Sequence, residues 1–420
     1  MTALDLEWIR SQFPALAQKL NGQPIIFFDG PGGTQVPIAV PEAISQYLLE
    51  SNSNTHGAFF TSERTDRLVI AARSACADLL GCDSDEIVFG ANMSTLTFML
   101  SRAIGRDLQP GDKILVTTLD HYANVSSWQA LEEQGVIVRT VDIHTDDCTL
   151  DLDDLKRQLN DRTRLVAVGY ASNAVGTIND VATITELAHQ VGAMVFVDAV
   201  HYAPHAAIDV RSLDCDFLVC SGYKFFGPHL GVLYGKRQHL EQLRPYKVQP
   251  APNQVPDRWE TGTLNFEALA GVMAAVDYLA AIGYRVISTA ASRRAALLAG
   301  LNAIQAYERE LSQLLISGLL QIPGITVYGI TDSDRFDWRT PTVSIRLDGY
   351  SPYKLAKQLG DRGIFVWNGN VYALGLTERL EIEDSGGFVR IGLVHYNTKD
   401  EVNRLLQVLD EITTPALSVD

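Results

Sequence analysis

The sequence predicts an α/β fold with a largely parallel sheet, and three observations carry this prediction. Between about residues 65 and 235, segments with helical spacing of apolar residues alternate with short β-branched runs. Several of these runs are apolar throughout, which is typical of strands covered by helices on both faces. The chain has 420 residues, more than a single core usually organises, so we expect a second domain.

The expected strands of this first region are bounded by Gly, Asp or Asn, and helices lie between them. The strands are 86–90, 112–120, 135–142, 164–173, 193–200, 216–221 and 231–235. The helices are 65–81, 130–135, 151–160 and 183–192. Strands that alternate with helices in this way predict parallel pairing through crossover connections.

After residue 265 the pattern changes to two long helices, 266–284 and 293–320. The elements that follow are strands 325–330, 342–347, 364–368 and 388–394 and helices 353–363 and 399–412. This arrangement predicts a smaller α+β domain. We therefore divide the chain into an N-terminal helix over 1–20 that packs on the small domain, a large domain over 21–280 and a small domain over 281–420.

Composition bounds the classes of partner. The chain has 34 Lys and Arg against 50 Asp and Glu, a formal net charge of −16, which repels phosphate backbones and anionic lipid. The most apolar windows are too short to span a bilayer, so we expect neither nucleic acid nor a membrane as partner. The first residues show no secretory signal, and the five cysteines show neither a CxxC pair nor a disulfide pattern. These features predict a cytoplasmic protein.

Four polar residues follow expected strands, at the edge where ligands of parallel sheets bind. They are His121, Asn173, Asp198 and Lys224. An Asp and a Lys at buried strand ends are costly unless each has a partner. Pyridoxal 5'-phosphate (PLP) explains both together, because it needs a lysine for covalent attachment and a carboxylate opposite its pyridine nitrogen. The sequence therefore predicts PLP as cofactor.

Two other ligand classes fit the sequence less well. Asp198, His201 and His205 suggest a metal site, but Pro204 breaks the helical spacing that two histidine ligands would need, so we expect no metal. The segment DGPGGT suggests a dinucleotide loop, but it lacks GxGxxG and no helix pattern follows it.

The order of the Asp and Lys motifs carries a family resemblance. VFVDAVHYAPHAAIDV followed by DCDFLVCSGYKFFGPHLGVLYG resembles the core of the class V aminotransferases, most closely the cysteine desulfurase and selenocysteine lyase group. Further matches, in the same order, are FFDGPGGTQVP, EIVFGANMSTLTFML, LDHYANVSSW, YASNAVGTIND, RWETGTLN and FVRIGLVHYNTKDEV. The resemblance covers about residues 20–412. It implies the PLP-dependent transferase fold (fold type I), with a mainly parallel sheet in the large domain, and an enzyme that acts on an amino acid.

The resemblance also implies roles around the cofactor ring. Lys224 would be the Schiff-base lysine and, with His121, a catalytic residue. Asp198 would pair with the pyridine nitrogen, and His121 would stack on the ring face. Asn173 and His201 match positions near the ring hydroxyl, although His201 stands where desulfurases usually have Gln.

Other matches surround the phosphate and the substrate. The residues that match phosphate contacts are Ser94, Thr95, Ser221, Tyr223 and Thr263. Tyr223 replaces the common His before the lysine, and Thr263 matches a residue that reaches the neighbouring subunit's phosphate, which implies a homodimer with shared active sites. Arg390 matches the arginine that binds the substrate carboxylate, and we place Asn368 and Asn370 at the substrate.

The sequence lacks one residue that the desulfurase resemblance would require, the catalytic cysteine. Desulfurases take up sulfur as a persulfide on a loop cysteine, and the corresponding loop, IFVWNGNVYALGL, contains none. All five cysteines precede residue 221, so a relay would need Cys220 or another distant thiol. We therefore expect a desulfurase relative that does not work through a persulfide.

Several reactions stay open without that thiol. Our first hypothesis is β-elimination, a C–S lyase reaction on a cysteine-type substrate. Aminotransfer or epimerisation is the alternative, and aminotransfer would need a second carboxylate-binding arginine, for which Arg258 and Arg64 are candidates. A non-catalytic scaffold is the third hypothesis, although the retained polar residues argue against it.

Overall fold

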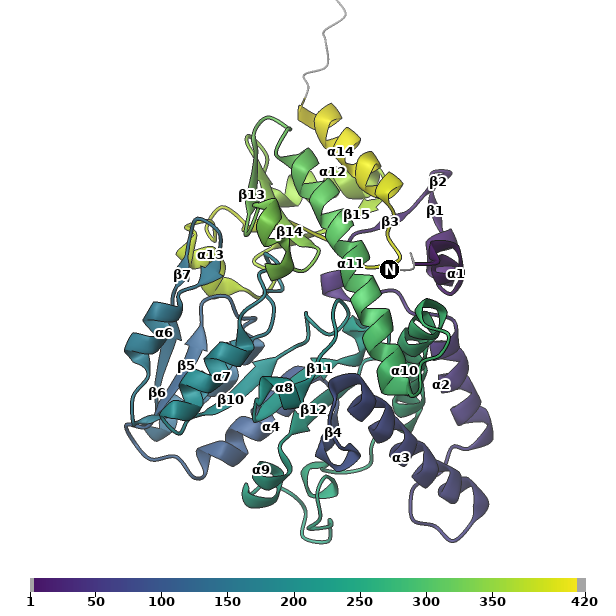
Figure 1. The fold of residues 1–420 in the computed structure, drawn as a ribbon, viewed down its shortest axis with the longest axis vertical. Helices are drawn as coiled ribbons and strands as arrows, with labels where there is room; N and C mark the ends of the chain where they lie inside the picture. Colours follow the sequence, from purple (N-terminus) through teal and green to yellow (C-terminus); the bar gives the residue numbers. More distant parts are fainter. Residues whose placement is uncertain (1–3, 414–420) are drawn as a thin grey trace, which may run out of the picture.

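A seven-stranded sheet is the centre of the larger region of the computed structural model, which describes residues 4–413 (Figure 1). Its strands, in spatial order, are β4 (Ile87–Gly90), β12 (Gly231–Gly235), β11 (Phe217–Ser221), β10 (Met194–Asp198), β9 (Thr163–Gly169), β5 (Lys113–Thr117) and β6 (Ile137–Val141). β12 is antiparallel to both neighbours, and the remaining pairs are parallel. The prediction of a largely parallel α/β sheet is confirmed.

Helices cover both faces of this sheet, as the fully apolar strands predicted (Figure 1). Phe196 of β10 packs in one core cluster with α4 (Met93–Gly105), α5 (Ala123–Gln129) and α9 (Arg237–Gln242). Val195 and Val197 of the same strand face the opposite cluster. The helices that contribute to that second cluster include α2 (Ala39–Glu50), α3 (Phe60–Leu80), α6 (Leu152–Gln158), α7 (Val181–Gln190), α8 (Val210–Leu213) and α10 (Phe266–Val286).

The smaller region is built on a four-stranded antiparallel sheet. Its strands, in spatial order, are β13 (Ile325–Tyr328), β14 (Thr342–Leu347), β17 (Phe388–Gly392) and β16 (Trp367–Gly369), and its helices are α11 (Arg293–Leu319), α12 (Pro352–Asp361), α13 (Leu374–Arg379) and α14 (Lys399–Thr413). The long helix α11 runs from this sheet down to α10 (Figure 1). Residue 280, our predicted boundary, lies inside α10.

The N-terminal segment contacts both regions. In α1 (Leu6–Ser11), Arg10 pairs with Glu401 of α14 at 2.9 Å, while Trp8 stacks on Tyr278 of α10. After the hairpin of β1 (Lys19–Leu20) and β2 (Gln23–Pro24), β3 (Ile26–Phe27) pairs in parallel with β15 (Ile364–Phe365). A second small hairpin, β7 (Ile143–His144) and β8 (Thr149–Leu150), follows β6. The β3–β15 pair ties the N-terminal segment to the strand that leads into β16.

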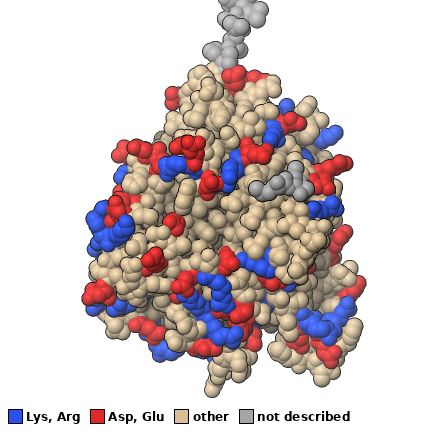
Figure 2. Space-filling model, in the orientation of Figure 1, with Lys and Arg blue, Asp and Glu red and all other residues tan. Residues whose placement is uncertain are grey.

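The surface and the most apolar helix bear on the partner predictions. Figure 2 shows acidic and basic side chains interspersed over the face in view, with no extended patch of one sign. By length and composition alone, α10 could cross a membrane. In the fold, however, 72% of the most apolar stretch of this helix is buried, and the helix packs against α2, α3 and α11. Among the described residues, α10 is therefore a buried core helix.

Candidate active site

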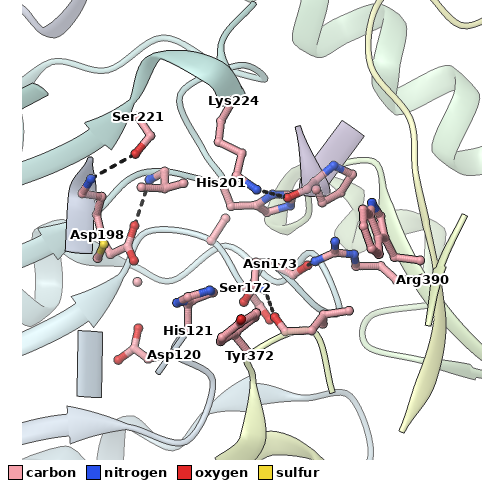
Figure 3. Close-up of a pocket in the computed structure, with 18 of the residues that line it drawn as sticks. Asp120, His121, Ser172, Asn173, Asp198, His201, Ser221, Lys224, Tyr372 and Arg390 are labelled. Carbon is pink, nitrogen blue, oxygen red and sulfur yellow. Dashed lines mark hydrogen bonds between the residues drawn. The ribbon is translucent and has the colours of Figure 1, made fainter. Parts of the chain in front are cut away.

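A cavity of about 430 Å³ lies where β9, β10 and β11 end, closed on one side by residues of β16 and β17 (Figure 3). This volume is in the range of small-molecule sites. The cavity gathers all but two of the predicted site residues: Ser94, His121, Asn173, Asp198, His201, Ser221, Tyr223, Lys224, Asn368, Asn370 and Arg390. In Figure 3, Lys224 enters opposite His121 and Tyr372, with Asp198 and Arg390 at the two ends.

Lys224 stands at the end of the short turn Gly222–Lys224 that follows β11. Its Nζ donates to the carbonyl of Pro31 and lies 4.7 Å from the centroid of the Tyr223 ring. Burial, reinforced by the Arg390 charge, lowers the pKa of Lys224 to about 7. An amine with this pKa is partly unprotonated at neutral pH, as a lysine nucleophile or proton carrier must be.

Asp198 is the last residue of β10, in register with Gly169 of β9 and Val219 of β11. Its Oδ1 accepts a hydrogen bond from the backbone N–H of Val200 at 2.9 Å. Burial raises the pKa of Asp198 to about 6, against the effects of that hydrogen bond and of Lys224. A carboxyl in this position gains from a cationic partner inside the cavity.

His121 follows β5 and presents its ring to the cavity. Its Nδ1 accepts from the N–H of Ala123 at 3.1 Å, which puts the proton of the neutral ring on Nε2. Burial, followed by the charges of Lys224 and Arg390, lowers its pKa to about 4. The ring stacks on Tyr372 with centroids 5.1 Å apart and planes at 18°. His121 is therefore a neutral, flat wall of the cavity.

Asp120 also lines the cavity, although we assigned it no role from the sequence. Its Oδ2 accepts from the N–H and the hydroxyl of Thr117 at 3.1 and 2.9 Å, while Oδ1 is buried without a partner. Burial and the neighbouring Asp198 raise its pKa to about 7. Its position directly before His121 at a strand end was the signal that could have found it.

Asn173 and His201 lie where hydrogen bonds to a ligand can form. Asn173 donates from Nδ2 to the carbonyl of Val371 at 2.8 Å, and its Oδ1 is buried without a partner. The Nε2 of His201 lies 3.1 Å from the hydroxyl of Thr340. Burial holds the pKa of His201 well below its usual range, so this ring is neutral.

Arg390 lies in the middle of β17, opposite Ser344 of β14 and Trp367 of β16. Its Nη1 donates to the carbonyl of Asn173 at 2.9 Å, and its Nε is buried without a partner. Burial lowers its pKa to about 9, which still leaves the guanidinium charged at neutral pH. A buried guanidinium with an unused N–H suits a carboxylate.

The N-terminus of α4 reaches the cavity through Asn92, Met93 and Ser94. The N–H of Met93 donates to the hydroxyl of Ser221 at 3.3 Å. Helix N-termini bind phosphate because their first N–H groups have no partner within the helix. Ser94, Ser221 and this helix end thus form a corner of the cavity whose chemistry suits an anion.

Two predicted phosphate contacts lie outside the cavity. The N–H and hydroxyl of Thr95 donate to Oδ1 of Asn92 at 2.9 and 3.0 Å, so this side chain takes part in capping α4. Thr263 is exposed and touches no part of the cavity in the single chain. Tyr223 does line the cavity and stacks on His229, with centroids 4.7 Å apart.

Asn368 and Asn370 line the cavity from β16 and the loop after it. The Asn370 side chain is used within that loop: Nδ2 donates to Glu383 at 3.0 Å, and Oδ1 accepts from the N–H of Tyr372 at 3.1 Å. Val371 and Tyr372 have left-handed φ values of 49° and 62°. Asn370 therefore fixes the loop in this structure.

None of the five cysteines lines the cavity. Burial raises the pKa of Cys76 to about 12 and that of Cys148 to about 11, and it also raises the pKa values of Cys82, Cys215 and Cys220. These thiols stay protonated at neutral pH, whereas nucleophilic sulfur chemistry needs a thiolate.

The family profile described as Aminotransferase class-V matches residues 26–405. The chain belongs to the class V aminotransferase family. Solved structures of similar fold align with nearly the whole chain. The chain of a Thermococcus onnurineus cysteine desulfurase in its apo form aligns with a TM-score of 0.87 and 28% identity over 98% of this chain and 99% of that one.

Curated relatives of this class V aminotransferase include cysteine desulfurases. One from Synechococcus elongatus is 33% identical across 99% of this chain, which spans only 65% of that protein's length. A probable cysteine desulfurase from Halalkalibacterium halodurans is 31% identical over 96% of this chain and 97% of that protein. An Escherichia coli cysteine desulfurase in its S-sulfonic acid form aligns with a TM-score of 0.84, 27% identity and coverage of 98% and 100%.

Class V aminotransferases use PLP, and this member is a PLP-dependent enzyme of fold type I. The cavity fits that cofactor in four ways. Lys224 offers a partly neutral amine, Asp198 a carboxyl that needs a cation, and Asn173 an unpartnered acceptor. The corner at Ser94 is suited to a phosphate.

Two aromatic residues of the cavity escaped a functional prediction. Trp367 and Tyr372 belong to the loop in which we assigned a role only to Asn368 and Asn370, and both line the cavity. Tyr372 contacts His121, a contact across more than 240 residues of chain that no local pattern reveals. The enrichment of the loop in aromatic and amide side chains was the available signal.

Proposed function

We propose that this class V aminotransferase is a C–S lyase that eliminates the sulfur substituent of a cysteine-type amino acid without a persulfide-carrying cysteine. One observation carries the proposal: Lys224, Asp198 and Arg390 line one cavity, and none of the five cysteines does. Similarity to several cysteine desulfurases supports a cysteine-type substrate.

The chain's own groups can position the substrate and move its proton. Arg390 would bind the substrate carboxylate through its unpartnered Nε. When bound, PLP supplies an electron-withdrawing ring that makes the Cα proton of an amino acid acidic. The neutral fraction of Lys224 can accept that proton at Nζ, because its pKa lies near 7. Asp198 and Asn173 would hold the cofactor, and His121 would cover it.

The fate of the sulfur separates this proposal from desulfuration. Transfer to the protein needs a thiolate next to the departing sulfur, and no described cysteine lines the cavity. Cys220, the substitute that the sequence left open, is buried with a raised pKa. The sulfur would therefore leave as a free thiol or as a persulfide.

Aminotransfer gains no support from the two arginine candidates. Arg258 donates to the carbonyls of Glu241 and Leu243, and Arg64 lies near Glu50 at the surface. Neither lines the cavity of this chain. Within the described residues of a single chain, neither candidate therefore provides the second carboxylate-binding arginine that aminotransfer would need.

Product analysis tests the proposal. Holoenzyme incubated with cystine or an S-substituted cysteine, without added keto acid, is expected to give equal amounts of pyruvate and ammonia. Product formation only when a keto acid is added would overturn it. Lys224→Ala should remove both the visible absorbance of the bound cofactor and the activity. Asp209→Ala, a helix cap remote from the cavity, serves as the matched control.

We further propose a homodimer. Leu49, Phe59, Phe60 and Ile70 expose large apolar side chains on and next to α2 and α3, as an interface would. The segment before Thr263 is attached to α3, since Arg73 of that helix pairs with Glu260 at 2.6 Å, and Thr263 is exposed beyond it. Analytical ultracentrifugation should give twice the chain mass, and Phe60→Asp should shift it toward the monomer. A monomeric wild type would overturn this proposal.

A further inference from the structure

We propose that Tyr372 and Trp367 form an aromatic rim that selects substrates by the group on sulfur, favouring neutral, apolar or aromatic S-substituted cysteines over cystine. This inference rests on the proposed lyase function and names its substrate class. In place of a cysteine, the loop from Trp367 to Tyr372 presents two aromatic side chains to the cavity.

The loop is held in place by hydrogen bonds from the cavity itself. Asn173 donates from Nδ2 to the carbonyl of Val371 at 2.8 Å, and the N–H of Tyr122 donates to the carbonyl of Tyr372 at 2.8 Å. Asn370 accepts from the N–H of Tyr372. These bonds keep two non-glycine residues, Val371 and Tyr372, in the left-handed region, which L-residues with a side chain rarely adopt. The loop that carries Trp367 and Tyr372 is therefore held in a defined conformation by these hydrogen bonds.

Both rim rings pack on the cavity and keep a face or edge open. Tyr372 stacks on His121 but remains 71% exposed. Trp367 is 49% exposed, and its indole lies directly over Gly32, where an added Cβ would meet Nε1 at 2.0 Å. Figure 3 places Tyr372 beside His121, opposite the tip of Lys224. A substituent that extends from the β-carbon toward this loop would meet aromatic surface.

The charges of the cavity point to a neutral substituent. Among the described residues, Lys224 and Arg390 are the only Lys or Arg side chains that line it, and both have roles with the cofactor and the substrate carboxylate. The loop from Trp367 to Tyr372 contributes no charged side chain. The acidic residues of the lining, Asp120 and Asp198, lie after β5 and at the end of β10, not on this loop. Cystine carries a second carboxylate and a second ammonium beyond its disulfide, and the loop from Trp367 to Tyr372 offers neither of them a counterion. A thioether with an alkyl or aryl group has no such requirement.

The reaction with such a substrate balances without any further reactant except water. The Cα–H and the Cβ–S bonds break, the sulfur leaves with a proton as the thiol, and hydrolysis of the three-carbon remainder gives pyruvate and ammonium. An S-substituted cysteine and one water thus yield one thiol, one pyruvate and one ammonium, with no change of oxidation state that needs an external oxidant or reductant.

A binding experiment tests the rim without elimination. Homophenylalanine replaces the sulfur of S-phenylcysteine by CH₂ and has no leaving group, while alanine lacks the distal group. The affinity of each for the holoenzyme is measured from the change in cofactor absorbance. We expect homophenylalanine to bind at least about tenfold more tightly than alanine, which is about 1.4 kcal/mol. Tyr372→Ala and Trp367→Ala should each reduce that ratio severalfold, and Tyr372→Phe should retain it.

Turnover completes the test. The wild-type kcat/KM for S-phenylcysteine should exceed that for cystine, and Tyr372→Ala should narrow the difference. Tyr353→Ala removes an equally exposed tyrosine outside the cavity and should change neither ratio. Equal affinity of the wild type for homophenylalanine and alanine would contradict the proposed selection by the rim. So would an affinity ratio that stays unchanged in both Tyr372→Ala and Trp367→Ala. Preferential binding without pyruvate from any substrate would instead overturn the lyase function and leave the rim standing.

Discussion

Asn370 braces the loop beside the cavity, and replacing it by alanine should loosen that loop without removing the cofactor. The side chain makes one hydrogen bond to the Glu383 carboxylate and accepts one from the Tyr372 amide. Such bonds contribute about 1.5–3 and about 1 kcal/mol respectively. Because the site is partly exposed, we take the lower end, about 2 kcal/mol in total. The left-handed conformations of Val371 and Tyr372 cost a similar amount, so the loop would lose most of its preference for the observed conformation.

Hydrogen exchange measures this loss directly. The amides of Tyr122 and Ala373 donate to the loop carbonyls of Tyr372 and Asn370, both at 2.8 Å, so opening exposes them. A change of about 2 kcal/mol corresponds to roughly 30-fold faster exchange at these amides. We expect that acceleration in Asn370→Ala, together with a higher KM and an unchanged cofactor absorbance.

A second substitution, at Val371, tests whether the left-handed backbone is what opens the loop. Val371→Gly in the Asn370→Ala background should slow exchange again by about tenfold, because glycine adopts a positive φ without steric cost. Asn160→Ala, which removes a turn hydrogen bond outside the cavity, should leave the loop amides unchanged. If Asn370→Ala impairs turnover while exchange at Tyr122 and Ala373 stays at the wild-type rate, Asn370 contacts substrate and does not brace the loop.

Two further predictions concern the charged groups. In cofactor-free protein, Lys224→Met should be more stable than wild type at pH 7 by on the order of 4 kcal/mol, because the pKa of Lys224 is about 7 in the fold and about 10.5 when unfolded. The unfolded chain binds the extra proton between these values, so the wild type gains stability as pH rises and the difference should shrink toward pH 10.5 in urea unfolding; a constant difference would contradict the low pKa. Arg390→Lys should raise KM for the amino acid by about 10–100-fold with a smaller effect on kcat, since a lysine cannot pair with a carboxylate in bidentate fashion, and an unchanged KM would remove the carboxylate role.

The sequence predicted the parallel core because its strands are buried on both faces. The apolar runs around Phe196 and Val219 appear as β10 and β11 of the central sheet. The antiparallel direction of β12 was not predicted, because the direction of a strand depends on its connection and not on its composition. Helices α2, α4 and α5 were also missed. α5 has only seven residues, and most of them fall within the segment LDHYANVSSW, which we interpreted only for His121.

The site was predictable where one strand end supplies one residue, as with Asp198 and Lys224. Contacts between distant segments were not. The stacking of Tyr372 on His121, the bond from Asn173 to Val371 and the unpartnered carboxyl oxygen of Asp120 all depend on tertiary packing. Asn370 shows the converse: its position near the substrate was expected, but its side-chain bonds hold the loop. Thr263 is exposed and lies outside the cavity of one chain, so the phosphate contact that we predicted for it would be made in a second subunit.

We propose that sulfur leaves this enzyme without passing through a protein thiol, and a cysteine-free variant tests this most directly. The five cysteines are replaced together by serine or alanine, and the purified holoenzyme is assayed for pyruvate and thiol release from S-phenylcysteine, with the cofactor absorbance confirming that the site is intact. We predict a kcat within about twofold of the wild-type value, because none of the cysteines lines the cavity. Loss of turnover in a variant that retains the cofactor absorbance, restored when a single cysteine is returned, would contradict the claim.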